Sequence, residues 1–184
     1  THEDIKELVQ YASERYINIL PEIDVPGHSL AALASYPELS CTPGEYYVSP
    51  GDRFMVWPGG GQHCYGLLDN TICPALEKSF EFLDKVFTEV AQLFPFQYIH
   101  MGGDETARKK KKKNEQIKAL MQKENLKNLD EVQSYFVKRV EKIINSKGKK
   151  MIGWDEILDG GLAPNAAVMS WRGMKGGIEA AKQG

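Results

Sequence analysis

Apolar side chains recur every three to four residues over several stretches of the chain, and this spacing predicts amphipathic helices. The strongest stripe follows Pro74, a residue that suits a helix N-terminus, and it ends before Pro95. Thr1 and Asp4 match a capping box at the start of the first helix, with the acid in place of the usual Glu. We expect helices over residues 5–16, 29–36, 74–94, 114–124, 129–146 and 178–183.

Four short runs between these helices are rich in β-branched and aromatic residues, a composition that predicts strands. The runs cover residues 17–23, 98–101, 151–154 and 167–171. Strands that alternate with helices are typical of parallel sheets with helical crossovers, so the predicted fold class is α/β. The connection between the last two strands has only 12 residues, which is near the lower limit for a parallel crossover.

Residues 37–74 show no sustained period and are rich in Gly, Pro and aromatic side chains. A segment of this length inside a compact domain is either functional or disordered. Trp57 in this segment could contact a substrate, although packing within the loop is the simpler expectation.

Polar and aromatic side chains cluster at the end of every predicted strand. In chain order the four clusters are Glu22, Asp24 and His28; Asp104 and Glu105; Trp154, Asp155 and Glu156; and Trp171 with Arg172. In parallel α/β folds the active site lies at the carboxyl ends of the strands and in the loops that follow them. Because four strands agree, we expect these clusters to meet in one site.

Asp104 and Glu105 are adjacent carboxylates that follow two glycines at the end of a strand. The glycines let the backbone turn sharply, so both side chains can face one pocket. Like charges held close together separate their pKa values and leave one carboxyl protonated near neutral pH. A glycosidase needs a protonated carboxyl beside an ionised one, which makes this pair the candidate acid pair. A solvated turn or a helix cap is the alternative.

Four further side chains are candidates for lining the same pocket. Asp24 and His28 are close enough in sequence to hydrogen-bond each other, although a helix cap and simple packing would explain them too. Trp154 and Trp171 stand at strand ends, where large aromatic rings suit sugar faces and acetyl groups. Ordinary packing is the alternative for both tryptophans.

Three other features have simpler structural explanations. We expect Asp155 and Glu156 to cap a helix and supply acid to its first turn, rather than to form a second acid pair. His100 lies within a strand and is expected to be an interior histidine with its hydrogen bonds satisfied. The run from Lys109 to Lys113 is expected to be a solvated segment.

The composition is that of an ordinary soluble globular protein, with 42% hydrophobic and 26% charged residues among 184, enough for one domain. A net charge of −2 argues against a dedicated nucleic-acid binder, and the lysine run has no interleaved aromatic residues. No apolar run approaches the ~20 residues of a membrane span. We therefore expect neither a nucleic-acid partner nor a membrane span.

Cys41, Cys64 and Cys73 are an odd number of cysteines without the spacing of a metal site. Buried or free thiols are the favoured interpretation, and a disulfide that joins Cys41 to Cys64 or Cys73 is the alternative. The chain opens on Thr1 rather than Met, so we expect a piece of a longer protein, in which a missing signal peptide means little.

Four motifs together resemble the family 20 glycoside hydrolases, the β-N-acetylhexosaminidases. The motifs are Pro-Glu-Ile-Asp-Val-Pro-Gly-His at 21–28, His-Met-Gly-Gly-Asp-Glu at 100–105, Gly-Trp-Asp-Glu at 153–156 and Ser-Trp-Arg-Gly at 170–173. They occur in the order in which the family has them, and the resemblance covers essentially the whole chain. One motif alone would be a weak signal, whereas four in order are a specific one.

The resemblance implies a (β/α)8 TIM barrel, of which residues 1–184 form the central part of a single catalytic domain. About four βα units are expected, with inner strands at 17–24, 98–104, 150–154 and 167–171 as the third to the sixth of the barrel. Half a barrel would expose two strand edges and an open core, so we expect the isolated chain to be inactive and to self-associate.

The resemblance also implies the roles of the site residues. Glu105 would protonate the leaving oxygen and then activate water, while Asp104 would bind the acetamido N–H and stabilise an oxazolinium-like intermediate. The substrate's own carbonyl oxygen would be the nucleophile, so no protein nucleophile is needed. Trp154 and Trp171 would clasp the N-acetyl group, and Asp24 and His28 would lie near the floor of the site.

The implied substrates are glycans that end in N-acetylglucosamine or N-acetylgalactosamine, including chito-oligosaccharides, and no metal or other cofactor is implied. Family members are usually secreted or periplasmic, or lysosomal in eukaryotes. An Arg from an earlier strand and a Tyr, a Trp and an acid from later strands belong to the family's site but have no counterpart in this chain. The lysine run at 109–113 also departs from the more mixed segment usual after the acid pair.

Three other functions are alternatives. Gly-Gly-Asp-Glu also occurs in diguanylate cyclases, but there it sits in a hairpin and continues into Phe, whereas Thr106 follows here. A non-catalytic sugar-binding module derived from the same barrel would have no need of the acid Glu105. An unrelated structural α/β domain would explain none of the four motifs.

Overall fold

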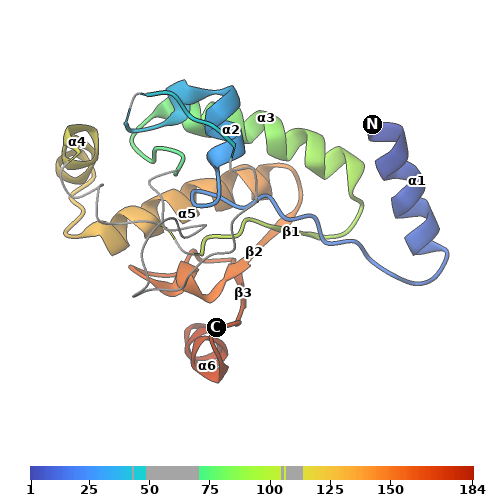
Figure 1. The fold of residues 1–184 in the computed structure, drawn as a ribbon. Coiled ribbons are helices and arrows are strands. Elements are labelled where there is room, and N and C mark those ends of the chain that lie inside the picture. The colour runs from blue at the N-terminus through green and yellow to red at the C-terminus, as the bar shows by residue number, and fades with distance from the viewer. Residues whose placement is uncertain (43, 49–70, 105, 107–113) are drawn as a thin grey trace, which may run out of the picture.

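The structure is a computed structural model that describes residues 1–42, 44–48, 71–104, 106 and 114–184. Within these residues the chain has an α/β fold with one small parallel sheet (Figure 1). The α-helices are α1 (His2–Ser13), α2 (Leu30–Ser35), α3 (Glu77–Leu93), α4 (Glu115–Lys123), α5 (Leu129–Ser146) and α6 (Met174–Gln183). The 3-10 helices are η1 (Pro37–Leu39) and η3 (Asp155–Leu158), and the strands are β1 (Tyr98–His100), β2 (Lys150–Trp154) and β3 (Ala167–Met169). None of the described helices is long and apolar enough to cross a membrane.

The three strands lie in the order β1-β2-β3, and both neighbouring pairs are parallel. His100 of β1 pairs with Ile152 of β2, and Trp154 at the end of β2 pairs with Met169 of β3. Since the strands run in the same direction, their carboxyl ends lie at one edge of the sheet. The parallel arrangement predicted from the sequence is therefore confirmed for these three strands.

The first predicted strand, residues 17–24, is reduced to a single parallel bridge between Glu22 and β1. The bridge joins Glu22 to His100, whose N–H donates to the carbonyl oxygen of Pro21 at 2.9 Å. Pro21 has no N–H of its own to donate, so the ladder of hydrogen bonds is short here. The segment still runs alongside β1 and brings Asp24 to the carboxyl end of the sheet.

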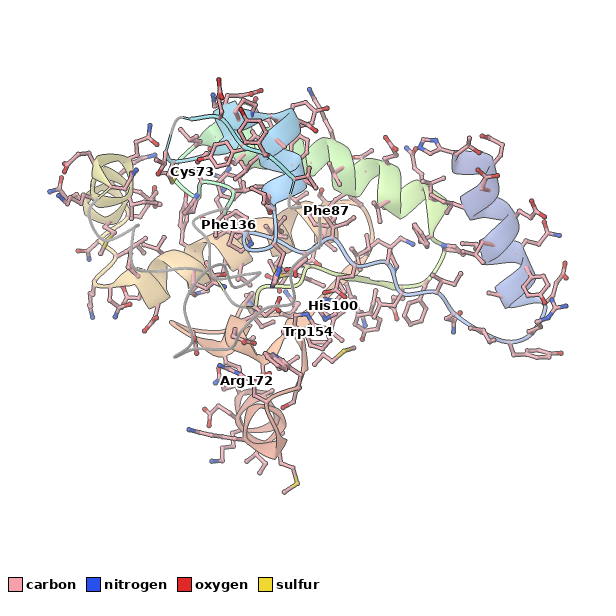
Figure 2. The ribbon with its side chains drawn as sticks, viewed as in Figure 1. Cys73, Phe87, His100, Phe136, Trp154 and Arg172 are labelled. Carbon is pink, nitrogen blue, oxygen red and sulfur yellow. A yellow bond between two sulfur atoms is a disulfide. The ribbon has the colours of Figure 1, made fainter. Side chains whose placement is uncertain are left out.

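Helix α5 packs against the sheet and α3 packs alongside α5 (Figure 1). The apolar stripes predicted for both helices form the centre of the core, where Phe87 of α3 and Phe136 of α5 are fully buried (Figure 2). Burial of apolar surface of this kind is the main stabilising contribution to such a fold. The core cluster consists of Val25, Ile72, Phe80, Leu83, Phe87, Ile99, Met101, Phe136, Val137, Val140, Ile144, Met151, Ile157 and Ala163.

Three of the helices have a side chain at the N-cap that accepts hydrogen bonds from the first turn. Thr1 and Asp4 form the predicted capping box of α1. Asn114 caps α4, and Asn128 caps α5, each by accepting backbone N–H groups of the first turn. These oxygens satisfy donors that have no partner inside the helix, which is why the helices begin where they do.

Five of the six predicted helices end within three residues of their expected bounds, and α6 differs more. Helix α6 begins at Met174 rather than at residue 178. Gly176 in its first turn lies against Asp155, and a Cβ at this position would come within 2.6 Å of the Asp155 Cβ, so glycine allows this close packing. The 12-residue crossover from β2 to β3 contains only the 3-10 helix η3. A crossover this short leaves little room for an α-helix.

Cys41 and Cys73 form a disulfide, so the interpretation of these two residues as free thiols is wrong. The bond links the segment after η1 to the start of the α3 region. An antiparallel bridge between Ser40 and Ile72 lies beside it. Cys64, the other partner considered for Cys41, lies outside the described residues.

Candidate active site

The carboxyl ends of the parallel segments carry the predicted site residues. Asp24 ends the segment beside β1, Asp104 follows β1, and Trp154 is the last residue of β2. Trp171 comes two residues after β3. The structure therefore places these four positions at one edge of the sheet, as expected for a parallel α/β fold.

Three predicted features lie outside the described residues. They are Glu105, which is the expected general acid, Trp57 in the long segment, and the run from Lys109 to Lys113. Their assignments stay predictions from the sequence.

Gly102 and Gly103 make the turn from β1 to Asp104, with φ angles of 71° and 95°. A Cβ on Gly102 would lie 1.8 Å from Asp24 Oδ1, so only glycine fits at this position. The Gly103 N–H donates to the same Asp24 oxygen at 3.3 Å, and its carbonyl accepts a hydrogen bond from Gln133 Nε2 at 2.8 Å. These contacts fix the start of the Asp104 loop against Asp24 on one side and α5 on the other.

His28 lies between the two carboxylates. Its Nε2 is 3.5 Å from Asp104 Oδ2 and 3.9 Å from Asp24 Oδ2. Both distances are longer than a good hydrogen bond, yet short enough for electrostatic attraction when the imidazole is protonated. The structure thus brings together Asp24, His28 and Asp104, three residues that the sequence analysis selected separately.

The two carboxylates have different environments. Burial raises the pKa of Asp24 from 3.8 to about 7, and the charge of Asp104 adds to the rise while that of His28 opposes it. Oδ1 of Asp104 is buried and has no hydrogen-bond partner among the described residues. A buried carboxylate oxygen without a donor is costly, so this oxygen is suited to accept an N–H or O–H from a bound molecule.

Ligand atoms of Asp24, His28 and Asp104 all lie within 4.8 Å of one another. Two carboxylates and an imidazole at this spacing have the chemistry of a divalent-cation site as well as that of a cluster that shares a proton. The expectation that no metal is required stays a prediction.

Trp154 is held on two sides at the end of β2, as Figure 2 shows for its contact with His100. The indole and imidazole centroids are 4.6 Å apart with an angle of 59° between the rings. The indole Nε1 donates to Glu22 Oε1 at 3.0 Å. The Trp154 backbone N–H donates to the Gly102 carbonyl at 2.9 Å, so the tryptophan is anchored beside the turn that leads to Asp104.

His100 is buried as predicted, but only one of its nitrogen atoms has a hydrogen-bond partner within the described part of the chain. Nδ1 accepts the Gly102 N–H at 3.0 Å, whereas Nε2 has no hydrogen-bond partner among the described residues. Burial lowers the pKa of His100, which favours the neutral ring. The 3.4 Å approach of Glu22 to Nδ1 would be an ion pair only if the ring were protonated, and the Gly102 bond argues against that state.

Asp155 and Glu156 supply acid to the first turn of η3, as predicted, but Trp154 is the N-cap, so their predicted capping role is wrong. Asp155 accepts the Trp171 N–H at 3.2 Å and the Arg172 Nε at 2.8 Å. Glu156 accepts the Trp171 indole Nε1 at 3.0 Å. Both acids are buried, and they bind the segment after β3 to the end of β2.

Three further side chains contribute to the site, and the sequence analysis had placed two of them, Glu22 and Glu156, in the strand-end clusters but had not selected Gln133. Glu22 binds the Trp154 indole, Glu156 binds the Trp171 indole, and Gln133 binds the Gly103 carbonyl. Gln133 had a recognisable signal, since it is a polar residue that falls on the buried apolar face of α5. The indole partners of the two glutamates had no such signal, because they lie 132 and 15 residues away in the sequence.

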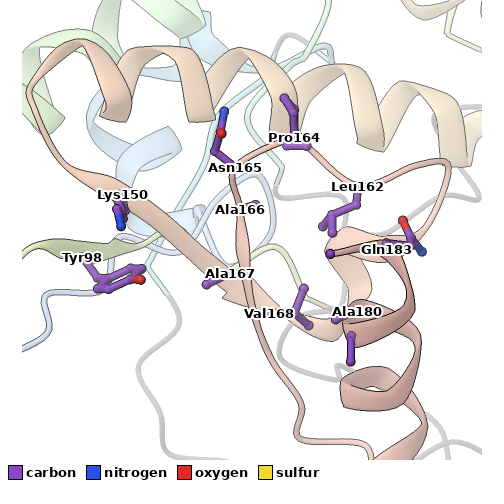
Figure 3. A pocket seen from close by; sticks show the side chains of 13 residues that line it. Tyr98, Lys150, Leu162, Pro164, Asn165, Ala166, Ala167, Val168, Ala180 and Gln183 are labelled. Atoms are coloured by element: carbon purple, nitrogen blue, oxygen red, sulfur yellow. The ribbon is translucent and has the colours of Figure 1, made fainter.

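A pocket lies at the other end of the sheet (Figure 3). Its wall includes Tyr98 and Lys150, the first residues of β1 and β2, together with Val168 of β3 and Leu162 in the crossover before it. None of the predicted site residues that the structure describes lines it. It is therefore separate from the chemistry at the carboxyl ends.

A sequence model for the catalytic domain of glycosyl hydrolase family 20 matches residues 1–184. The chain belongs to this family. Family 20 membership confirms the resemblance carried by the four motifs. It also removes the support for a diguanylate cyclase and for an unrelated structural domain.

Curated family 20 relatives match nearly all of the chain. A β-hexosaminidase of Porphyromonas gingivalis is 45% identical over 181 residues, which cover 98% of this chain and 22% of that protein. A β-hexosaminidase of Vibrio furnissii is 34% identical over 100% of this chain and 28% of that protein. The chain thus spans less than a third of the length of these relatives.

Solved family 20 structures match the fold. The chitobiase of Flavobacterium johnsoniae has a TM-score of 0.84 at 36% identity, over 100% of this chain and 27% of that one. An exo-β-N-acetylglucosaminidase of Vibrio harveyi in complex with N-acetylglucosamine has a TM-score of 0.81 at 35% identity, with the same coverage. Family 20 domains have a TIM-barrel fold, and the parallel α/β arrangement described here agrees with it. The division into four central βα units stays a prediction.

Proposed function

We propose that the protein containing this chain is a retaining β-N-acetylhexosaminidase that removes terminal, non-reducing N-acetylglucosamine or N-acetylgalactosamine. The observation that carries the proposal is the buried Asp104 Oδ1, which has no hydrogen-bond partner among the described residues. It lies one residue before Glu105 at the carboxyl end of a strand in a family 20 chain. Such an oxygen suits the N–H of an acetamido group.

In the proposed reaction the substrate supplies its own nucleophile. The acetamido carbonyl oxygen attacks the anomeric carbon as the glycosidic bond breaks, and Glu105 gives its proton to the leaving oxygen. Asp104 accepts the acetamido N–H and stabilises the positive charge of the oxazolinium intermediate. Glu105 then takes a proton from water, whose oxygen attacks the same carbon, reopens the ring and restores the original anomeric configuration.

At acidic pH, Asp24 adds little negative charge beside Asp104. With a pKa raised to about 7, mainly by burial, Asp24 carries a proton over most of the acidic range. A neutral Asp24 does not repel the charge of Asp104, and a protonated His28 would favour that charge. The cluster is thus suited to keep a negative charge where positive charge develops in the reaction.

The proposed substrates follow from the site and from the relatives. Glycans that end in an N-acetylhexosamine, including chito-oligosaccharides, present the acetamido group that Asp104 would bind. A Vibrio harveyi relative has been solved in complex with N-acetylglucosamine. We also propose a secreted or periplasmic location, or a lysosomal one in a eukaryote, which the Cys41–Cys73 disulfide supports because such bonds persist in oxidising compartments.

Hydrolysis of an aryl N-acetylglucosaminide by the full-length protein tests the proposal. Asp104→Asn should lower kcat/KM by about 10²–10³-fold, because it removes the charge that stabilises the cationic intermediate. Glu105→Gln should cost about 10²–10⁴-fold by removing the proton donor.

Asp84→Asn is the matched control, since Asp84 lies on α3 in an ion pair with Lys147, and it should leave kcat/KM unchanged. Binding of N-acetylglucosamine without hydrolysis by the unaltered protein would instead favour a sugar-binding module. Full activity of Asp104→Asn would contradict the role given to Asp104.

A further inference from the structure

Both tryptophans at the candidate site have their indole N–H bound by a glutamate from another strand end. Trp154 donates to Glu22 and Trp171 donates to Glu156, each at 3.0 Å. An indole has only one hydrogen-bond donor, at one edge of the ring, so a single acceptor is enough to define how the ring is turned.

The Trp154 ring is restrained in two directions. Glu22 binds its edge, and the buried His100 packs against its face with ring centroids 4.6 Å apart. Glu22 and His100 are themselves joined by the parallel bridge between their segments. Loss of the Glu22 carboxylate would therefore leave the ring packed on one side and free to turn about its side-chain torsions.

The Trp171 ring is restrained although Trp171 is 48% exposed. Its backbone N–H is bound by Asp155, and its indole N–H is bound by Glu156, which is buried. Arg172 extends this group through its bond to Asp155 and its 3.6 Å approach to Glu156. Because about half of Trp171 is exposed to solvent, these hydrogen bonds contribute to its orientation.

We propose that Glu22 and Glu156 are positioning residues that set the selectivity of the site for the acyl group on the sugar nitrogen. The inference rests on the proposed function and on the expectation, implied by the family resemblance, that Trp154 and Trp171 clasp the N-acetyl group. Each glutamate fixes the angle of one indole, and the two indoles together fix the width of the acyl pocket. If either ring is free to turn, the pocket becomes wider, and a substrate with a larger acyl group loses less kcat/KM relative to the acetyl substrate.

The test compares aryl N-acetylglucosaminide with its N-propionyl analogue as substrates of the full-length protein. The unaltered enzyme should prefer the acetyl substrate by roughly 10–200-fold in kcat/KM, the discrimination typical of one methylene. Glu22→Met and Glu156→Met keep the length of the side chain but remove the carboxylate acceptor. Each should lower the acetyl-to-propionyl ratio by about tenfold or more, because loss of fit in an acyl pocket costs discrimination of that size.

Two controls separate positioning from a general structural effect. Glu22→Gln and Glu156→Gln retain an oxygen that can accept the indole N–H, so they should keep the ratio near that of the unaltered enzyme. Glu77→Ala removes a carboxylate that binds Arg139 away from the site, and it should leave the ratio unchanged.

If a Met variant does not fold, Trp154→Phe or Trp171→Phe removes the same bond from the other side. The phenylalanine variant should show the same loss of selectivity.

The outcomes distinguish the two proposals. No turnover of either substrate by the unaltered protein would overturn the proposed function and this inference with it. Turnover by the unaltered protein, with Met or Phe variants that lose activity equally on both substrates, would overturn only this inference. An unchanged rate in those variants would overturn it as well.

Discussion

Among the described acids of the site, Asp24 is the one whose pKa the folded structure raises most. Its side chain is mostly buried, and the groups that face it are Asp104, His28, Glu22 and the Gly103 N–H. Burial and the charges of Asp104 and Glu22 raise its pKa, while His28 and the Gly103 N–H lower it, and the result is a pKa of about 7. A carboxyl with such a pKa changes charge within the range in which the proposed enzyme would work.

Asp24 should make folding less favourable as the pH rises. Below about pH 4 the carboxyl is protonated in both the folded and the unfolded chain, so it has no effect on stability. Between about pH 4 and pH 7 only the folded chain keeps the proton, and stability is lost through this window. A rise from 3.8 to about 7 corresponds to at most about 4 kcal/mol.

Asp24→Asn removes this titration while its amide oxygen can still accept the Gly103 N–H. The full-length variant should therefore lose less stability than the unaltered protein between pH 4 and pH 8, measured as the change in Tm or in the free energy of unfolding. Asp84→Asn should follow the unaltered protein across the same range. Parallel curves for Asp24→Asn and the unaltered protein would contradict the prediction, because they would show that folding does not raise the pKa of Asp24.

At the scale of elements, the Cys41–Cys73 disulfide joins segments 32 residues apart. Closing a loop of this length lowers the entropy of the unfolded chain and stabilises the fold by about 3–4 kcal/mol. Cys41→Ser, Cys73→Ser and the double variant should each lower the free energy of unfolding by that amount. Denaturant unfolding measures the loss, and peptide mapping of the unaltered protein should recover the Cys41–Cys73 link.

The three variants provide their own control. Because each breaks the same bond, the double variant should cost no more than either single one. Additive losses would mean that the two cysteines stabilise the protein independently, as buried thiols, and that the disulfide does not form in solution.

Much of this arrangement of elements could be predicted from the sequence, because it depends on local patterns. The apolar stripes of α3 and α5 and the alternation of strands with helices are local signals, and the structure confirms them. The single bridge at Glu22 and the contacts of Asp155 and Glu156 depend on partners far away in the chain. No local pattern indicates which distant group a buried carboxylate will bind.

The same limit applies to the candidate site. Motifs located Asp24, His28, Asp104 and Trp154, and the parallel strands brought them to one edge of the sheet. The motifs did not reveal that the pKa of Asp24 is strongly raised. That shift arises from burial and from charges on other segments, which only the folded arrangement defines.

At the scale of the whole molecule, the described sheet has open sides. Among the described residues, strand β3 is hydrogen-bonded to β2 on one side only, and the segment around Glu22 pairs only with β1. Large apolar side chains are exposed close by, among them Met174 at 83% and Ile178 at 53% on α6, which packs against β3. Unpaired strand edges beside exposed apolar surface favour association with other chains.

We therefore predict that residues 1–184 expressed alone self-associate and do not hydrolyse an aryl N-acetylglucosaminide. The free edge of β3 and the apolar face of α6 would pair with other copies, and the site would lack the groups that further strands of a barrel supply. Light scattering after size-exclusion chromatography measures the association, and the full-length protein at equal concentration is the reference for turnover. A monomeric, active isolated chain would mean that these residues are a complete domain rather than the centre of a larger barrel.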